Sequence, residues 1–298
     1  MRLHTCYSSA YAPPCVPTLA RLAIAARELD RLNLVDLHEP TALSAAELTG
    51  LHEETYLSAF LLGREPLASS QGIAWSPQLR DATLAMLGGQ LEAARHALRH
   101  GLAMNLARGF HHAVWARGSG FCPLNGLALV ALRLPQHRIF VIDCDEHGGN
   151  GTEEYAARLP NLHAASIFGT RFGCMGGPRS LAREVRVPRD GFQAYRAALR
   201  DIANLLAEQR PDLVLYQAGA DCHVDDPKSR VRLTTRRFVE RDLQVLRMLR
   251  SLDLPTVIIA AGGYQSAAAV AQLNIATVRC ALHVQRKEWP FARGPAVP

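Results

Sequence analysis

Apolar positions along the chain follow two patterns, one with helical spacing and one of short unbroken runs. Apolar residues that recur every three or four positions predict helices that bury one face. Short runs without polar alternation predict strands buried on both sides of a parallel sheet. The predicted helices span 16–32, 44–62, 81–100, 126–134, 152–158, 191–209 and 235–252, and the predicted strands span 139–142, 162–168, 213–216 and 256–260.

The alternation of these strands and helices predicts an α/β fold, with a parallel sheet that has helices on both faces. The chain has 298 residues and shows no internal repeat, low-complexity tract or obvious domain linker. We therefore expect a single domain that spans residues 1–298.

Charge and cysteine content limit where the protein works and what it binds. The formal net charge is +6, with lysine only at Lys228 and Lys287. Because the arginines are scattered and not clustered, we expect no specific nucleic acid binding. Seven cysteines without a C-x-x-C pair indicate a reduced chain. With no signal-peptide pattern and no segment approaching membrane-span length, we expect a cytoplasmic protein that does not enter a membrane.

The strand predicted at 139–142 leads into the first candidate for chemistry, and 138–152 reads RIFVIDCDEHGGNGT. Asp143, Asp145 and His147 occupy alternate positions, so in an extended chain they project on the same side. Two carboxylates and an imidazole in a glycine-rich turn suit a divalent metal ion. A solvated loop would also use these residue types, since Asp and Gly are common in turns. This stretch alone leaves both interpretations open.

Two other predicted strands end in polar, glycine-flanked residues. Asp221 follows the strand at 213–216, and Tyr264 follows the last strand. In open parallel sheets, ligands bind outside the carboxyl ends of the strands. The adjacent His111 and His112 lie in a loop that could close over the same edge. Scattered surface polarity would not select strand ends, so the combined pattern favours a metal site.

Four segments, in this order and spacing, closely resemble the histone deacetylase family: GFHHA…GSGFCPLN, IDCDEHGGNGT, AGADCHVDDP and AGGYQ. The resemblance spans at least residues 51–282 and is nearest to bacterial and class IV-like members. It implies the arginase/deacetylase fold and an amidohydrolase that removes an acetyl or longer acyl group from an amine. It also implies Zn²⁺, with Fe²⁺ as the alternative, and acylated lysine in a protein or peptide as substrate. An acetylpolyamine or another small amide is the alternative substrate.

The resemblance further implies which residues bind cations. It assigns the zinc ion to Asp145, His147 and Asp221, a set that leaves positions open for water and a substrate oxygen. It also places a potassium site at Asp143 and Ser166. For Ser166, an ordinary buried strand position is an equal alternative.

The catalytic roles follow from the same resemblance. His111 and His112 match the tandem histidines that act as general base and acid. Asp143 matches the carboxylate paired with the first histidine, and Asn150 stands where many relatives carry a second aspartate. A neutral amide orients His112 without raising its pKa as a carboxylate would. Tyr264 matches the tyrosine that donates a hydrogen bond to the substrate carbonyl.

A narrow tunnel for the acylated side chain is the last feature that the resemblance implies. Gly120 and Phe121 match one wall, Phe172 is the choice for the opposite wall, and Gly263 is placed beside the tunnel. Two segments depart from the family pattern, PPCVPTLARLA near the N-terminus and PKSRVRL after Asp226, where relatives generally show a Leu-Gly turn. Both departures bear on substrate choice and not on hydrolysis.

Other protein classes fit less well. Ureohydrolases of the arginase type share the fold but bind two manganese ions, and Gly149 and His223 stand where carboxylates would hold the second ion. A haloacid-dehalogenase-like phosphatase would need a suitably placed lysine. A dinucleotide-binding protein would need G-x-G-x-x-G after a strand.

Overall fold

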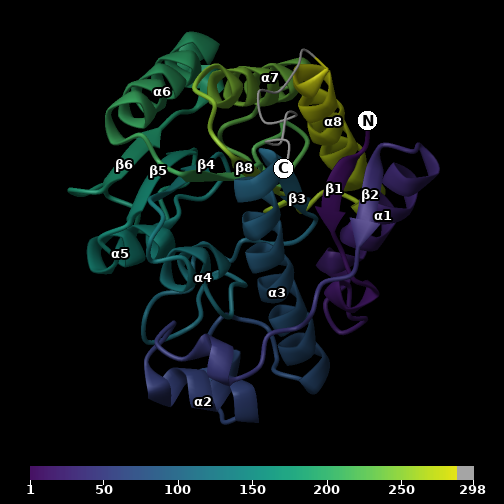
Figure 1. Ribbon diagram of the computed structural model, residues 1–298, viewed down its shortest axis with the longest axis vertical. Coiled ribbons are helices and arrows are strands. Elements are labelled where there is room, and N and C mark those ends of the chain that lie inside the picture. The colour runs from purple at the N-terminus through teal and green to yellow at the C-terminus, as the bar shows by residue number, and fades with distance from the viewer. Residues whose placement is uncertain (287–298) are drawn as a thin grey trace, which may run out of the picture.

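Eight parallel strands form one sheet within residues 1–286, the part of the chain that the computed structural model describes. Their order across the sheet is β2-β1-β3-β8-β7-β4-β5-β6 (Figure 1). The predicted parallel sheet is confirmed, and residues 287–298 of the predicted domain lie outside the described residues. The strands are β1 (Leu3–Cys6), β2 (Val35–His38), β3 (Leu102–Asn105), β4 (Ile139–Asp143), β5 (Leu162–Phe168), β6 (Ser180–Glu184), β7 (Leu213–Gln217) and β8 (Thr256–Ile259).

The central strands are covered on both faces, which explains their unbroken apolar sequences. Every residue of β3, β4, β7 and β8 is buried. The pairing of β4 with β7 runs in step from Ile139 opposite Leu213 to Asp143 opposite Gln217. Because the register is in step, the carboxyl ends of β4 and β7 lie level at the same edge of the sheet.

Two layers of helices enclose the sheet (Figure 1). In one layer α8 contacts α1 and α7, and α7 contacts α6; in the other, α4 contacts α3 and α5. Helix α2 lies beyond α4 in Figure 1, away from the sheet. The helices are α1 (Ala20–Arg31), α2 (Glu54–Leu62), α3 (Pro77–His100), α4 (Gly126–Arg133), α5 (Asn150–Arg158), α6 (Val187–Gln209), α7 (Thr235–Ser251) and α8 (Ala267–Gln285).

The boundaries of α3 show how local sequence sets a helix end. The Ser76 side chain accepts a hydrogen bond from the Leu79 N–H, and Pro77 occupies the first turn, where its missing N–H costs nothing. The helix stops at Gly101, which adopts a φ of 89°. This left-handed backbone region is readily open to glycine.

Among the strands and α-helices, the sequence pattern did not predict β1, β2, β3, β6 and α8. None of these four strands contains four apolar residues in a row, the signal that predicted β4 and β7. The helix predicted at 44–62 is wrong in its first half. Residues 46–48 form a single 3₁₀ turn, Gly50 adopts a φ of 78°, and α2 begins only at Glu54.

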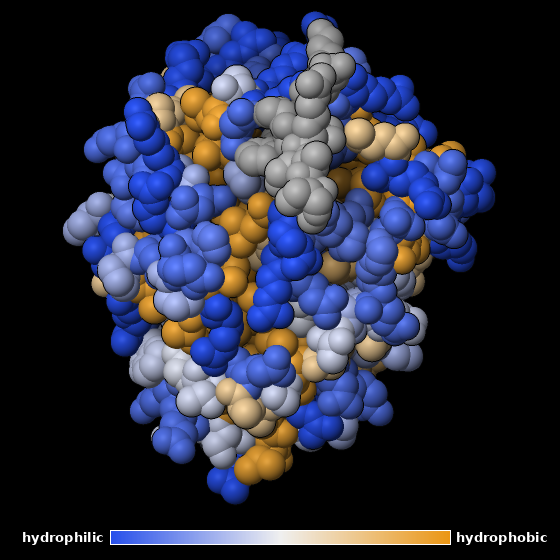
Figure 2. All heavy atoms as spheres, viewed as in Figure 1, coloured by the Kyte–Doolittle hydropathy of each residue, from blue (hydrophilic) through white to orange (hydrophobic). Residues whose placement is uncertain are grey.

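The expectation that no segment approaches membrane-span length does not hold for α8. Among the described residues, it is the one helix long and apolar enough to cross a membrane by length and composition. However, 61% of its apolar window is buried inside the protein. It packs against α1 and α7, as a core helix of an α/β fold does. Figure 2 shows one face of the molecule covered mainly by hydrophilic side chains, with hydrophobic ones in patches between them.

A buried arginine on α7 ties the ends of β4 and β7 together. Arg241 is fully buried and forms a 2.8 Å ion pair with Asp242. Its Nη1 donates to the carbonyl oxygen of Cys144 at 3.2 Å and to that of Gly219 at 2.8 Å. Asp242 in turn accepts a 2.5 Å hydrogen bond from the hydroxyl of Tyr216. The loops that follow the two strands are therefore fixed to each other through one guanidinium group.

We predict that Arg241→Met lowers the free energy of unfolding by about 3–5 kcal/mol, because it leaves the buried carboxylate of Asp242 without its partner. Denaturant titration of both proteins measures the change. The matched control is Arg236→Met at an exposed position of the same helix, which should change stability by less than about 0.5 kcal/mol. Equal stability of the two variants would contradict a bracing role for Arg241.

Candidate active site

The predicted site residues gather at one edge of the sheet. Strands β3, β8, β7 and β4 are neighbours and run parallel, so the segments that follow them meet outside their carboxyl ends. These segments are 106–125, 260–264, 218–226 and 144–149. Four stretches that are far apart in the sequence thus contribute side chains to one place.

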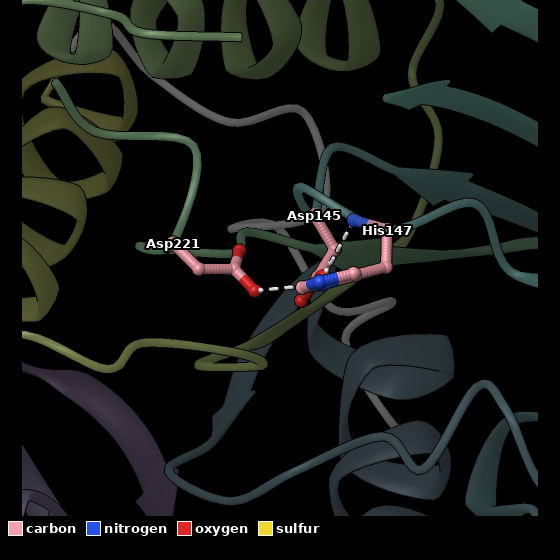
Figure 3. Close-up of side chains that lie close together, drawn as sticks. All are labelled: Asp145, His147 and Asp221. Atoms are coloured by element: carbon pink, nitrogen blue, oxygen red, sulfur yellow. Dashed lines mark hydrogen bonds and ion pairs between the residues drawn. The ribbon is translucent and has the colours of Figure 1, made fainter. Parts of the chain in front are cut away.

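Asp145, His147 and Asp221 lie together with their side chains directed at a common point (Figure 3). Their potential ligand atoms all lie within 4.8 Å of one another. Nδ1 of His147 is 3.3 Å from Oδ1 of Asp145 and 3.4 Å from Oδ2 of Asp221. Two carboxylates and one imidazole form a donor set that binds a divalent cation and leaves coordination positions open.

The electrostatics of this cluster favour a bound cation. Burial and the neighbouring Asp145 raise the pKa of Asp221 to about 7. Burial alone would lower the pKa of His147, but hydrogen bonds with the two carboxylates outweigh it and raise that pKa to about 10. For Asp145 burial is likewise outweighed, and His111 and His147 hold its pKa well below the usual range. The two buried carboxylates share the positive charge of one imidazole, and a divalent cation would neutralise them more fully.

The surroundings of the carboxylates also fit a metal ion. Oδ2 of Asp221 is buried, and within residues 1–286 its recorded contact is the 3.4 Å ion pair with Nδ1 of His147. Its Oδ1 accepts the Glu146 N–H at 3.0 Å, and Oδ2 of Asp145 accepts the Gly262 N–H at 2.9 Å. A Cβ at Gly262 would lie 2.3 Å from Oδ2 of Asp221. The backbone thus approaches the carboxylates closely and leaves one oxygen of Asp221 available to an ion.

The two histidines stand side by side, each oriented by a different partner. Nδ1 of His111 donates to Oδ2 of Asp143 at 2.7 Å, and Nδ1 of His112 donates to Oδ1 of Asn150 at 2.7 Å. The ring centroids are 3.9 Å apart, and Nε2 of His111 is 3.8 Å from Oδ1 of Asp145. Because the partner oxygens only accept, each neutral ring carries its hydrogen on Nδ1 and keeps an unprotonated Nε2.

The different surroundings shift the pKa values of the two imidazoles in opposite directions. Burial alone would lower the pKa of His111, but the carboxylates of Asp143 and Asp145 outweigh it and raise that pKa. Burial and the adjacent His111 lower the pKa of His112 well below its ordinary value, with only the amide of Asn150 as a direct partner. His112 therefore favours the neutral form, and His111 favours the charged form.

Tyr264 lies beside the cluster, next to His147. Its ring centroid is 6.3 Å from that of His147, and its backbone N–H donates to Oδ2 of Asp226 at 2.7 Å. Burial raises the pKa of Tyr264, so the phenol keeps its proton at neutral pH and can donate it in a hydrogen bond.

Aromatic rings flank the cluster on two sides. Phe172 covers His112 with 4.0 Å between ring centroids and is 41% exposed. Phe121 lies beside Tyr264 with 6.3 Å between centroids. Gly120, with a φ of 51°, packs against His112 so closely that a Cβ would lie 2.4 Å from its ring. The structure therefore places Gly120 and Phe172 beside His112 and Phe121 beside Tyr264, and the predicted tunnel walls stay a prediction.

The two remaining predicted residues lie in packed surroundings. Gly263 is buried, and a Cβ there would meet Val270 of α8 at 2.6 Å. Ser166 pairs with Asp143 across β4 and β5, and its Oγ accepts the Gly149 N–H at 3.4 Å. Close packing explains Gly263 without a tunnel, while Ser166 and Asp143 remain neighbours as a shared cation site requires.

Comparison with known proteins decides the family. The histone deacetylase domain model matches residues 16–280. An uncharacterized protein of Picosynechococcus sp. is 32% identical over 76% of this chain and 78% of its own length. Histone deacetylase 2 of Arabidopsis thaliana is 26% identical over 78% of this chain, and acetoin utilization protein AcuC of Bacillus subtilis is 28% identical over 69%. These matches span 64% and 60% of those two relatives.

The chain belongs to the histone deacetylase family. It is accordingly a hydrolase that acts on amide bonds. The fold agrees, since the crystal structure of acetylpolyamine aminohydrolase from Burkholderia pseudomallei superimposes with a TM-score of 0.76. That comparison covers 95% of this chain and 99% of the other at 22% identity. The predicted arginase/deacetylase fold is thereby confirmed.

Some residues of this deacetylase-family site were not predicted from the sequence. Asp226, interpreted as loop structure, holds the backbone of Tyr264. Glu146 is buried and accepts the Val231 N–H at 3.0 Å, which fixes the loop after Asp221. Arg108 is buried and lines a small cavity beside Tyr264. Asp226 and Glu146 lie inside the recognised motifs, whereas no periodicity or spacing marks Arg108.

The geometry favours one metal ion over two. Within residues 1–286, one group of three metal-binding side chains comes together, and it is the cluster of Asp145, His147 and Asp221. Nε2 of His223 lies 3.0 Å from the hydroxyl of Thr235, outside that cluster. This arrangement does not support the binuclear site of a ureohydrolase.

We predict that the protein binds one divalent metal ion per chain, and that Asp145→Asn or Asp221→Asn removes it. Each substitution takes away one of the two anionic ligands. Elemental analysis of purified protein measures metal content, and circular dichroism checks that the fold is retained. The control is Asp225→Asn, an exposed carboxylate in the same loop as Asp221. Stoichiometric metal in both ligand variants would exclude this ligand set.

We predict that Asn150→Asp raises the pKa of His112, because a carboxylate at the same position stabilises the imidazolium. If neutral His112 is the working base, the acidic limb of the kcat/KM profile moves to higher pH. If His112 works as the acid, the basic limb moves up instead. Complete pH profiles, with metal content checked, separate these outcomes. Superimposable profiles would exclude a functional contact between Asn150 and His112.

Proposed function

We propose that the protein is a zinc-dependent deacylase that hydrolyses the amide bond of an acylated lysine in a protein or peptide. The observation that carries this proposal is the placement of His111, His112 and Tyr264 around the cluster that Asp145 and Asp221 build. A proton acceptor, a cation-binding cluster and a phenolic donor within one pocket are the groups that amide hydrolysis by water needs.

The residues divide the proton transfers between them. When bound, a divalent cation supplies positive charge that polarises the carbonyl and makes water more acidic. Nε2 of His112 accepts the proton of the attacking water, because its Nδ1 is already engaged by Asn150. The hydroxyl of Tyr264 donates a hydrogen bond to the carbonyl oxygen as negative charge develops there. A histidine then returns a proton to the leaving amine.

A small cavity beside Tyr264 bears on the size of the acyl group. It has a volume of about 20 Å³ and is bordered by His111, Asp145, Tyr264, Arg108 and Gln217. A cavity needs roughly 10–15 Å³ on this measure to hold one water molecule, so this one takes a group of about methyl size. We therefore propose acetyl as the preferred acyl group.

The remaining assignments follow the same reasoning. Zinc is proposed because it favours mixed imidazole and carboxylate ligands, and ferrous iron accepts the same set. The adjacent Asp143 and Ser166 side chains support a separate potassium site. The seven free cysteines agree with a reducing, cytoplasmic location.

The decisive test is hydrolysis of acyl-lysine peptides by the zinc-loaded protein. We expect release of acetate from an acetyl-lysine peptide and much slower cleavage of butyryl- and decanoyl-lysine peptides. Tyr264→Phe should keep the metal yet lose about 100- to 1000-fold in kcat, the usual effect of removing one oxyanion donor. An inactive wild-type protein with full metal content would contradict the proposal. Near-native kcat in the phenylalanine variant would remove Tyr264 from the mechanism.

A further inference from the structure

Lys228 places a positive charge at the mouth of the active site. It is one of the two lysines of the chain and lies in the segment that departs from the family pattern. Its side chain is exposed, yet Nζ lies 4.9 Å from the ring centroid of Tyr264 and 5.6 Å from that of Phe121. Ammonium groups at these distances are attracted by aromatic rings. The charge is therefore held beside the two rings, not spread through solvent.

The backbone fixes this position relative to the catalytic tyrosine. Oδ1 of Asp226 accepts the N–H of Lys228 at 3.0 Å, while Oδ2 accepts the N–H of Tyr264 at 2.7 Å. One buried carboxylate thus sets the location of both residues. The backbone of Lys228 is therefore held at a fixed position relative to the backbone of Tyr264.

The charge of Lys228 is not neutralised by a nearby carboxylate. Within residues 1–286, Lys228 forms no ion pair, and Asp226 is occupied by the two backbone N–H groups. Asp225 is exposed and faces His223, with 3.7 Å between its Oδ2 and Nδ1. Further in, Arg108 adds a second positive charge at the cavity beside Tyr264. Lys228 and Arg108 therefore both place positive charge near Tyr264.

We infer that Lys228 makes the active site select its substrates by charge. Acylated amines that carry a carboxylate near the far end of the alkyl stem should bind well, and those that carry a second ammonium group should bind poorly. This inference rests on the proposed function and narrows its substrate class: it favours acyl-lysine next to acidic groups and disfavours acetylpolyamines. Like charges repel and opposite charges attract across the mouth, and salt weakens both effects.

The test uses three ligands that share an acetamide and a four-carbon stem and differ only at the far end. N-acetyl-5-aminopentanoate ends in a carboxylate, N-pentylacetamide ends in a methyl group, and N-acetylputrescine ends in an ammonium group. Calorimetry with zinc-loaded Tyr264→Phe measures their dissociation constants without turnover. We expect the carboxylate ligand to bind best and the ammonium ligand worst. The dissociation constant should rise about threefold to tenfold from the carboxylate to the methyl ligand, and by a similar factor from the methyl to the ammonium ligand. These differences should be smaller in about 0.5 M salt.

Substitutions at Lys228 in the same background identify the source of the selection. Lys228→Met keeps a similar side-chain length without charge, and the three ligands should then bind within about twofold of one another. Lys228→Glu should reverse the order. Arg230→Met removes the same charge from an exposed position in the same loop and should leave the order unchanged. Equal binding of the three ligands, no binding at all, or the same flattening by Arg230→Met would overturn the inference.

Wild-type turnover separates this inference from the proposed function. If the acetyl-lysine peptide is hydrolysed but the three ligands bind equally, charge selection by Lys228 fails and the deacylase proposal stands. If nothing is hydrolysed while binding still follows charge and depends on Lys228, the deacylase proposal fails and the selection stands.

Discussion

Two carboxylates brought into the interior of the protein control the arrangement of the site. Asp145 and Asp221 are both buried, and an isolated buried carboxylate is expensive to keep ionised. The backbone N–H groups of Glu146 and Gly262 offset part of this cost. The remainder calls for a cation, and the imidazole of His147 completes a set of ligands for one. Both the fold and the chemistry therefore depend on one electrostatic requirement, a positive charge beside the two buried carboxylates.

Two features of the fold hold the carboxylates close to each other. One is the register of the strands, and the other is a set of buried residues that support the loops. Strands β4 and β7 run in step, so the loops that carry the two carboxylates leave the sheet at the same level. Arg241 binds carbonyl oxygens on both following loops, and Glu146 holds the loop beyond Asp221. Arg241 acts on the loops through their carbonyl oxygens, whereas Glu146 also donates its backbone N–H to Asp221. Their effect is to keep the short distances between groups that would otherwise repel one another.

The sequence predicted the centre of the molecule better than its edges. Strands β4 and β7 carry unbroken apolar runs because both of their faces are covered, so the sequence itself indicates these buried strands. The partly exposed β2 and β6 mix polar and apolar residues over few positions, so nothing distinguishes them from loops. The site residues could be named because they lie in dense motifs at strand ends. The contacts of Asp226 and Arg108 depend on which loops meet in space, which no local pattern records.

The amide of Asn150 affects the total charge of the site. With Asp143, Asp145 and Asp221 ionised, a divalent cation and a protonated His111 would bring the sum to zero. A carboxylate at position 150 would leave one net negative charge in a buried place. Balanced in this way, these five groups together exert little long-range force on an approaching substrate. Attraction and repulsion at a distance then depend on the groups nearest to solvent.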